Sequence, residues 1–74
     1  MAPIGSKIAE SREFGEVIRR RRQDLGLTQQ QLADSIGVAR RVVGELERGK
    51  ETVRIRIALD AVNALGLTLR AEER

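Results

Sequence analysis

Residues 27–50, which read L-T-Q-Q-Q-L-A-D-S-I-G-V-A-R-R-V-V-G-E-L-E-R-G-K, decide the fold. They describe two short helices joined by a tight turn. Thr28 favours a helix start, because its hydroxyl can accept a hydrogen bond from a free backbone N–H of the first turn. The apolar residues that follow share one face at helical spacing: Leu32, Ala33 and Ile36. We expect this helix to end at Gly37, because helices commonly end in a left-handed residue.

The second helix is expected over residues 39–48. Val43 and Leu46 lie three residues apart and give this helix a buried face, and Gly49 ends it. Its start is weakly capped, because Ala39 has no side-chain oxygen to accept from the backbone. Two helices that meet steeply through a short glycine-containing turn form a helix-turn-helix. The second helix of this motif can lie in the major groove of DNA.

A further helix is expected on either side of this motif. Ser11 is expected to cap the first, which runs to Asp24, with Gly26 in the left-handed position after it. One face of this helix is apolar except for two arginines: Phe14, Val17, Ile18, Arg21, Arg22 and Leu25. The last helix covers residues 55–65 and is closed by Gly66. Its apolar positions repeat at helical spacing: Ile55, Ala58, Leu59, Val62 and Leu65.

Residues 67–71, L-T-L-R-A, alternate between apolar and polar side chains and form the one segment that favours a strand. A lone strand leaves its backbone donors and acceptors open, so it stays irregular or pairs with a copy of itself. The expected fold is therefore all-α, with four helices and a short C-terminal strand. We expect a flexible N-terminal arm over residues 1–10, a DNA-binding domain over 11–66, and a dimerisation strand and tail over 67–74.

The composition excludes most other classes of function. The 74 residues include neither cysteine nor histidine, which excludes disulfides, zinc sites and histidine-based catalysis. Phe14 is the only aromatic residue, so stacking platforms for single-stranded nucleic acid are absent. No general base, nucleophile pair or metal cluster can be assembled, so we expect neither an enzyme nor a cofactor. No apolar run reaches the roughly 20 residues of a membrane helix and no secretory segment is present, so we expect a cytoplasmic protein.

The positive charge is unevenly distributed along the chain. Residues 1–50 carry ten Lys/Arg against seven Asp/Glu, whereas residues 51–74 carry four of each. The whole net charge of +3 therefore lies on the part of the chain that contains the helix-turn-helix. This distribution favours contact with phosphates.

An ordered set of residues resembles the XRE family, the lambda-type Cro/repressor helix-turn-helix domain: Thr28-Gln29, Leu32-Ala33, Gly37-Val38, Val43 and Leu46-Glu47-Arg48-Gly49. With the flanking helices, the resemblance covers residues 14–69. It implies an ion pair between Arg22 and Glu47 that ties the first helix to the end of the third. Because both ions must lose water, we expect the pair to fix the angle of the recognition helix rather than to add much net stability.

The resemblance also implies which side chains read DNA bases, namely Arg40, Arg41 and Glu45. An arginine bidentate to guanine is the commonest specific contact, so G·C pairs are expected in each half-site. Arg41 and Glu45 are one helical turn apart. The alternative to base reading by these two residues is an exposed ion pair that contributes little to stability. Glu45 therefore has two interpretations: it accepts from cytosine N4, or it holds Arg41 in position.

Contacts with the DNA backbone are assigned to the residues around these: Thr28, Gln29, Val42, Lys50, Arg54 and Arg56. The resemblance implies that Gln29 anchors a phosphate. The three cations lie in and after the loop that leaves the recognition helix, and a solvated loop is an equal alternative for each. Val42 has two further interpretations, contact with a thymine methyl group and partial burial against the preceding helix.

Residues 52–55 and 64–70 are similar to HipB-like antitoxins in particular. In that subgroup a C-terminal strand pairs across a two-fold axis to build a dimer. The implied interface joins this strand to the last helix: Val62, Leu65, Leu67, Thr68, Leu69, Arg70 and Ala71. The implied partners are palindromic double-stranded operator DNA, a second copy of the chain, and a HipA-like kinase toxin, with no membrane.

Two functions of different classes stay open at this point. The first is a sequence-specific DNA-binding transcriptional repressor, either the antitoxin of a HipBA-like toxin–antitoxin operon or a stand-alone XRE-family regulator. The second is a protein-interaction module with secondary DNA binding. Arg40, Arg41 and Gln29 favour the first, because an interaction module has no reason to place them at groove-facing positions.

Overall fold

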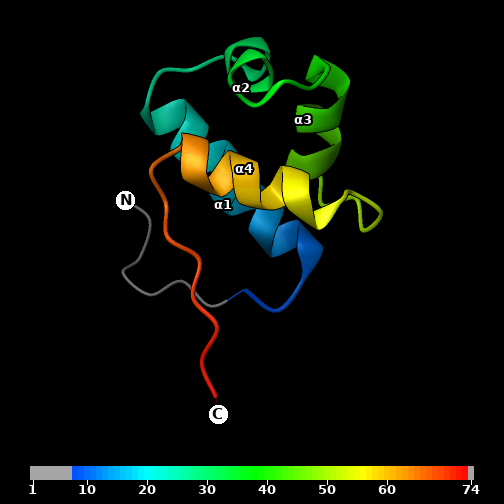
Figure 1. Cartoon of the computed structure of the whole chain (residues 1–74), viewed down its shortest axis with the longest axis vertical. Coiled ribbons are helices and arrows are strands. Elements are labelled where there is room, and N and C mark those ends of the chain that lie inside the picture. The colour runs from blue at the N-terminus through cyan, green and yellow to red at the C-terminus, as the bar shows by residue number, and fades with distance from the viewer. Residues whose placement is uncertain (1–7, 74) are drawn as a thin grey trace.

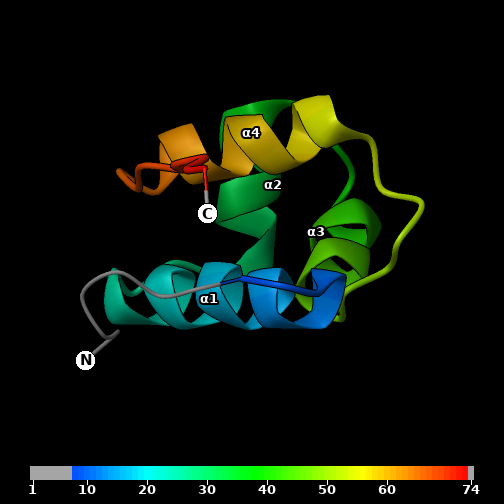
Figure 2. The ribbon, with the colours of Figure 1, turned by 90° about the horizontal axis from the view of Figure 1, so that it is seen from below.

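The computed structural model describes residues 8–73, which form four helices and no strand. The helices are α1 (Ser11–Asp24), α2 (Gln29–Ile36), α3 (Arg40–Glu47) and α4 (Ile55–Ala64) (Figure 1). Figure 2 shows α1 and α4 on opposite sides of the molecule, with α2 reaching between them and α3 at one end. The expected all-α helix-turn-helix architecture is therefore confirmed. Most of the N-terminal arm predicted over residues 1–10 lies outside the described residues.

The start of α1 differs from the prediction. Ser11 was expected to cap this helix, but Glu10 holds the N-cap position and makes no side-chain cap hydrogen bond. Ser11 is the first residue inside the helix. The Glu13 carboxylate instead accepts a hydrogen bond at 3.2 Å from the backbone N–H of Ala9, just before the helix. An acidic side chain in the first turn thus satisfies a free donor, as the glutamate of a capping box does.

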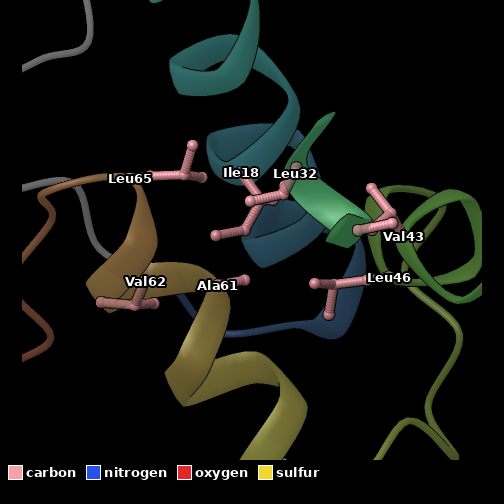
Figure 3. Close-up of a cluster of buried hydrophobic side chains, with 8 residues drawn as sticks. Ile18, Leu32, Val43, Leu46, Ala61, Val62 and Leu65 are labelled. Carbon is pink, nitrogen blue, oxygen red and sulfur yellow. The ribbon is translucent and has the colours of Figure 1, made fainter. Parts of the chain in front are cut away.

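Every helix contributes to one hydrophobic core (Figure 3). The buried side chains are Ile18 from α1, Leu32 and Ala33 from α2, Val43 and Leu46 from α3, Ala61 and Val62 from α4, and Leu65 just after it. Burial of this apolar surface, at roughly 25 cal/mol per Å², is the main force that holds the helices together. The two helices of the helix-turn-helix and the two flanking helices therefore share one hydrophobic core.

The buried face of α4 agrees only in part with the face that its spacing predicted: Ala58, Val62 and Leu65 pack in or against the core as expected, but two other residues do not. Ile55 is 74% exposed and Leu59 is also exposed, whereas Ala61 is fully buried. The cause is that α4 carries apolar side chains on most of its circumference, so periodicity alone does not select one face. Val62 and Leu65, which were also predicted to join a dimer interface, are buried in the core of the single chain and leave little surface for a second copy.

Two glycines allow α3 to end directly on α1. A Cβ atom added to Gly15 would lie 2.5 Å from the carbonyl oxygens of Leu46 and Glu47. Gly49 has a φ of 80°, and a Cβ there would lie 2.5 Å from the Cα of Arg12. Only glycine permits backbones to approach so closely. Gly15 was not identified from the sequence, because a lone glycine in a helical pattern carries no sign of its packing partner.

The segment after α4 begins in a fixed position and then leaves the core. The Leu67 N–H donates to the Val62 carbonyl at 2.9 Å, and the Leu67 side chain packs against the core. Arg21 of α1 donates from Nε to the Leu65 carbonyl at 2.9 Å, an interaction that the sequence did not reveal. Residues 68–73 are exposed and irregular in the single chain. The strand predicted over residues 67–71 requires a second copy and stays a prediction.

Candidate nucleic-acid interface

Local capping fixes the entry to α2. The Thr28 hydroxyl accepts from the backbone N–H of Gln31 at 3.0 Å, and the Gln31 side-chain oxygen accepts from the Thr28 N–H at 2.8 Å. These reciprocal hydrogen bonds form a capping box, which satisfies two donors that a helix start leaves free. The exit is fixed by Gly37, whose φ of 74° is left-handed. The predicted start and end of α2 are both confirmed.

The residues of α3 divide between a buried face and an exposed face. Val43 and Leu46 enter the core, while Arg40 and Arg41 are exposed at the start of the helix. Gly44 is buried with Val43 and Leu46. Ala39 caps the helix without a side-chain hydrogen bond, as the sequence predicted. The exposed face therefore presents two arginines beside the turn of the motif.

The predicted ion pair between Arg22 and Glu47 lies behind this face. Arg22 donates to both carboxylate oxygens of Glu47, from Nε at 2.6 Å and from Nη2 at 3.1 Å. Its third hydrogen bond runs from Nη1 to the Leu27 carbonyl at 2.7 Å. The two residues are only 8% and 7% exposed. One guanidinium thus joins the end of α1, the loop before α2 and the end of α3, with the planar fork geometry that makes arginine–carboxylate pairs strong.

Gln29 connects this ion pair to the exposed arginines. Its Nε2 donates to Glu47 Oε1 at 3.1 Å, and its Oε1 accepts from Arg40 Nη1 at 3.3 Å. The amide orientation follows from the partners, because a carboxylate only accepts and a guanidinium only donates. Gln29 was expected to anchor a phosphate. In the free protein its amide is shared between two side chains and keeps one N–H for such a contact.

The Glu45 carboxylate on α3 lies between two cationic side chains, those of Arg41 and Lys50. Its two carboxylate oxygens accept from different residues, Oε1 from Arg41 and Oε2 from Lys50. The hydrogen bond from Lys50, followed by the charges of Lys50 and Arg41, lowers the pKa of Glu45 below 4.5, while partial desolvation opposes this shift. A lowered folded-state pKa means that these ion pairs are present above pH 4.5 and are lost as the pH falls through the folded value.

The remaining predicted contact residues lie beside this cluster. Val42, Lys50 and Arg54 line a shallow depression of about 170 Å³ next to α3, together with Arg41, Glu45, Thr52, Val53 and Ile57. Val42 is half-buried there, and Arg54 is exposed at the N-cap of α4. Arg56 lies one turn from Asp60, with an N–O distance of 3.8 Å, so part of its charge is already balanced. The structure therefore brings five of the predicted residues to one surface and places Arg56 on α4.

No helix in residues 8–73 is both long and apolar enough to cross a membrane. The same residues contain no cluster of three acidic side chains that could hold a metal ion.

Comparison with known proteins gives three kinds of match. The helix-turn-helix family matches residues 18–71. An uncharacterized HTH-type transcriptional regulator of Methanothermobacter thermautotrophicus is 40% identical over 50 residues, which cover 68% of this chain and 72% of the relative. Solved structures of a HipA–HipB–O2–O3 complex and of HipB with an O4 20mer superpose with a TM-score of 0.84 at 20% identity, covering 92% of this chain and 96% of theirs. The chain therefore belongs to the XRE-type helix-turn-helix family of DNA-binding transcriptional regulators.

Proposed function

We propose that this chain represses transcription by binding a palindromic operator as a homodimer, with α3 of each copy in a major groove. The observation that carries the proposal is the start of α3. Arg40 and Arg41 are exposed there, while the end of the same helix is held by the buried Arg22–Glu47 pair. A recognition helix requires this combination, because its angle must be fixed while its base-reading side chains stay free.

The proposed contacts separate into two kinds. Arg40 and Arg41 read guanine edges, and Glu45 keeps Arg41 aimed along the helix. Arg54 and the N-terminus of α2 at Thr28 and Gln29 contact phosphates, which set position and salt dependence but carry no sequence information. Lys50 and Arg56 reach phosphates only after parting from their acidic partners. Val42 contacts the DNA from the edge of the same surface.

This division predicts different behaviour for two arginine variants. Arg41→Ala is expected to weaken binding to the preferred duplex by about 1–3 kcal/mol and to change binding to a scrambled duplex much less. Arg54→Ala is expected to weaken both about equally and to flatten the salt dependence by about one unit. The measurement is a titration of parent and variants against both duplexes at several salt concentrations. Equal losses on both duplexes for Arg41→Ala would reassign Arg41 to the phosphates.

The proposed dimer uses residues 67–71 and the apolar side chains that the single chain leaves exposed. Ile8, Ile55, Leu59 and Leu69 all border one groove of about 330 Å³, which also exposes part of Phe14. Leu69, in the middle of the predicted strand, is the residue of 67–71 that borders this groove. Pairing of two such strands across a two-fold axis would satisfy their backbone groups and cover the apolar side chains.

The dimer is tested with a pair of matched substitutions. Leu69→Lys is expected to give a monomer in sedimentation, because a lysine opposes strand pairing at an exposed edge. Leu25→Lys makes the same chemical change at another exposed leucine, outside the groove, and is expected to leave the dimer intact. A deletion should begin at residue 68, since Leu67 packs on the core. If Leu69→Lys and the 68–74 deletion both sediment as dimers, residues 67–71 are not the dimer element.

The finer proposal is that the chain is the antitoxin of a HipBA-like operon. Its support is the fold shared with HipB, whose solved structures include a complex with HipA. A stand-alone regulator is the alternative within the same class. Co-expression of the chain with the product of the neighbouring gene distinguishes the two: an antitoxin forms a complex with a kinase encoded there and suppresses its toxicity, and a stand-alone regulator does neither.

A further inference from the structure

Glu45 is the acidic centre of an otherwise cationic surface. Its side chain is only 13% exposed, whereas those of its partners Arg41 and Lys50 are 74% and 52% exposed. Each of its carboxylate oxygens holds one of the two cations. The backbone N–H of Lys50 also donates to the Glu45 carbonyl at 3.0 Å, which fixes the loop beside the carboxylate. The arrangement links a residue at the start of α3 to one after its end.

This geometry affects contacts with DNA bases and contacts with DNA phosphates differently. Arg41 gives one donor to Glu45 and keeps the others of its five N–H groups, so it can still donate to a guanine edge from its present position. A phosphate contact by Lys50 or Arg41 is different, because a phosphate, unlike a guanine edge, carries a full negative charge, and the Glu45 carboxylate repels it and already balances the charge of both cations. Binding to random DNA depends almost wholly on phosphate contacts. Glu45 therefore opposes random binding more than it opposes base reading.

We propose, on the basis of the DNA-binding function proposed above, that Glu45 determines specificity by withholding Arg41 and Lys50 from phosphates of non-operator DNA. The discrimination comes from weaker binding to the wrong sequence rather than from an added contact with the right one. This is the form of specificity in which an unfavourable element excludes competitors. It differs from direct recognition of cytosine by Glu45, which would act only on the preferred sequence.

The test compares Glu45→Gln with Glu51→Gln in the full-length chain. Glu51 is exposed one residue after Lys50, so the second variant makes the same charge change next to the same cation. Each protein is titrated against a random-sequence duplex and against the tightest duplex selected from a randomised pool, at several salt concentrations. Circular dichroism checks that both variants keep the parent's helical content.

Glu45→Gln is expected to tighten binding to the random duplex by about eight-fold in 0.1 M salt for each cation released. For each phosphate contact, the logarithm of the binding constant falls by about 0.9 per tenfold rise in salt concentration, which corresponds to about eight-fold between 0.1 M and 1 M salt. The salt dependence should steepen by the same slope, and the preference for the selected duplex should fall. Glu51→Gln is expected to stay within about two-fold of the parent, since it releases no cation. Adding Lys50→Ala to Glu45→Gln should remove the share of the gain that comes from Lys50.

Three results would overturn the proposal. If the two glutamine variants tighten random binding equally, only the overall charge matters. If Glu45→Gln weakens binding to the selected duplex and leaves random binding unchanged, Glu45 reads a base directly. If Glu45→Gln loses its helical content, Lys50→Ala, which retains Glu45, is measured instead. If Lys50→Ala weakens binding to random DNA as much as Arg54→Ala does, Lys50 already contacts phosphates and is not withheld from them. A parent protein that binds no duplex even at low salt contradicts the proposed function itself.

Discussion

Replacement of Glu47 by alanine is expected to lower the free energy of unfolding by about 3–5 kcal/mol. The substitution would leave the Arg22 guanidinium, now 8% exposed, without its bidentate partner, and would remove the acceptor of the Gln29 amide. A buried charge that loses its ionic partner is strongly destabilising, because it has given up water and, here, would keep only the hydrogen bond to the Leu27 carbonyl. A domain of 74 residues has little stability in reserve, so much of the variant is expected to be unfolded at 37 °C.

Urea denaturation followed by circular dichroism measures this loss. Glu51→Ala removes an exposed carboxylate and is the matched control, with an expected change below about 0.5 kcal/mol. The double variant Arg22→Met/Glu47→Leu separates the pair from its parts: it should recover much of the stability, since an apolar replacement of a buried ion pair is often neutral. A loss of less than about 1 kcal/mol for Glu47→Ala would mean that solvent reaches the pair.

The second large effect is expected from Gly15→Ala. The added methyl group would lie 2.5 Å from two carbonyl oxygens at the end of α3, and neither is a flexible side chain that can move aside. Forcing an extra carbon into such a contact costs typically about 1–3 kcal/mol. The backbone would have to part where α1 meets α3, so we also expect weaker DNA binding through a misplaced recognition helix.

Gly44→Ala provides the control, because Gly44 is also a buried helical glycine. A Cβ there would meet only the end of the Arg48 side chain, at 3.2 Å, and that side chain can shift. Alanine is favoured over glycine inside a helix by about 0.5–1 kcal/mol, so Gly44→Ala should be neutral or stabilising. Similar chemical denaturation midpoints for the two variants would contradict the close approach at Gly15.

The helices and their boundaries were largely predictable because they are encoded locally. Thr28 begins α2 and Gly37 ends it through interactions that span only a few residues, and the apolar period marks the spans between such signals. The Arg22–Glu47 pair was predictable by a different route. Two arginines on an apolar stripe indicated an unusual environment, and the family resemblance supplied the partner.

The features that escaped prediction depend on contacts between distant parts of the chain. The need for glycine at Gly15 arises from carbonyls more than thirty positions later, and Arg21 meets the Leu65 carbonyl 44 positions away. Neither contact leaves a periodic signal. The face of α4 was only partly predicted because apolar residues surround that helix, and tertiary packing, including that against α2, leaves Ala61 buried and Ile55 exposed.

We propose above that this chain recognises a specific duplex sequence through α3. Selection of duplexes bound by the full-length protein from a pool with a randomised segment of about thirty base pairs, followed by sequencing, tests it most directly. We expect enrichment of a two-fold symmetric motif whose G·C-containing half-sites lie about one helical turn, near 34–36 Å, apart. The half-site preference should be lost with Arg40→Ala/Arg41→Ala. A bound pool with the same composition as the starting pool would show that the chain does not discriminate between DNA sequences.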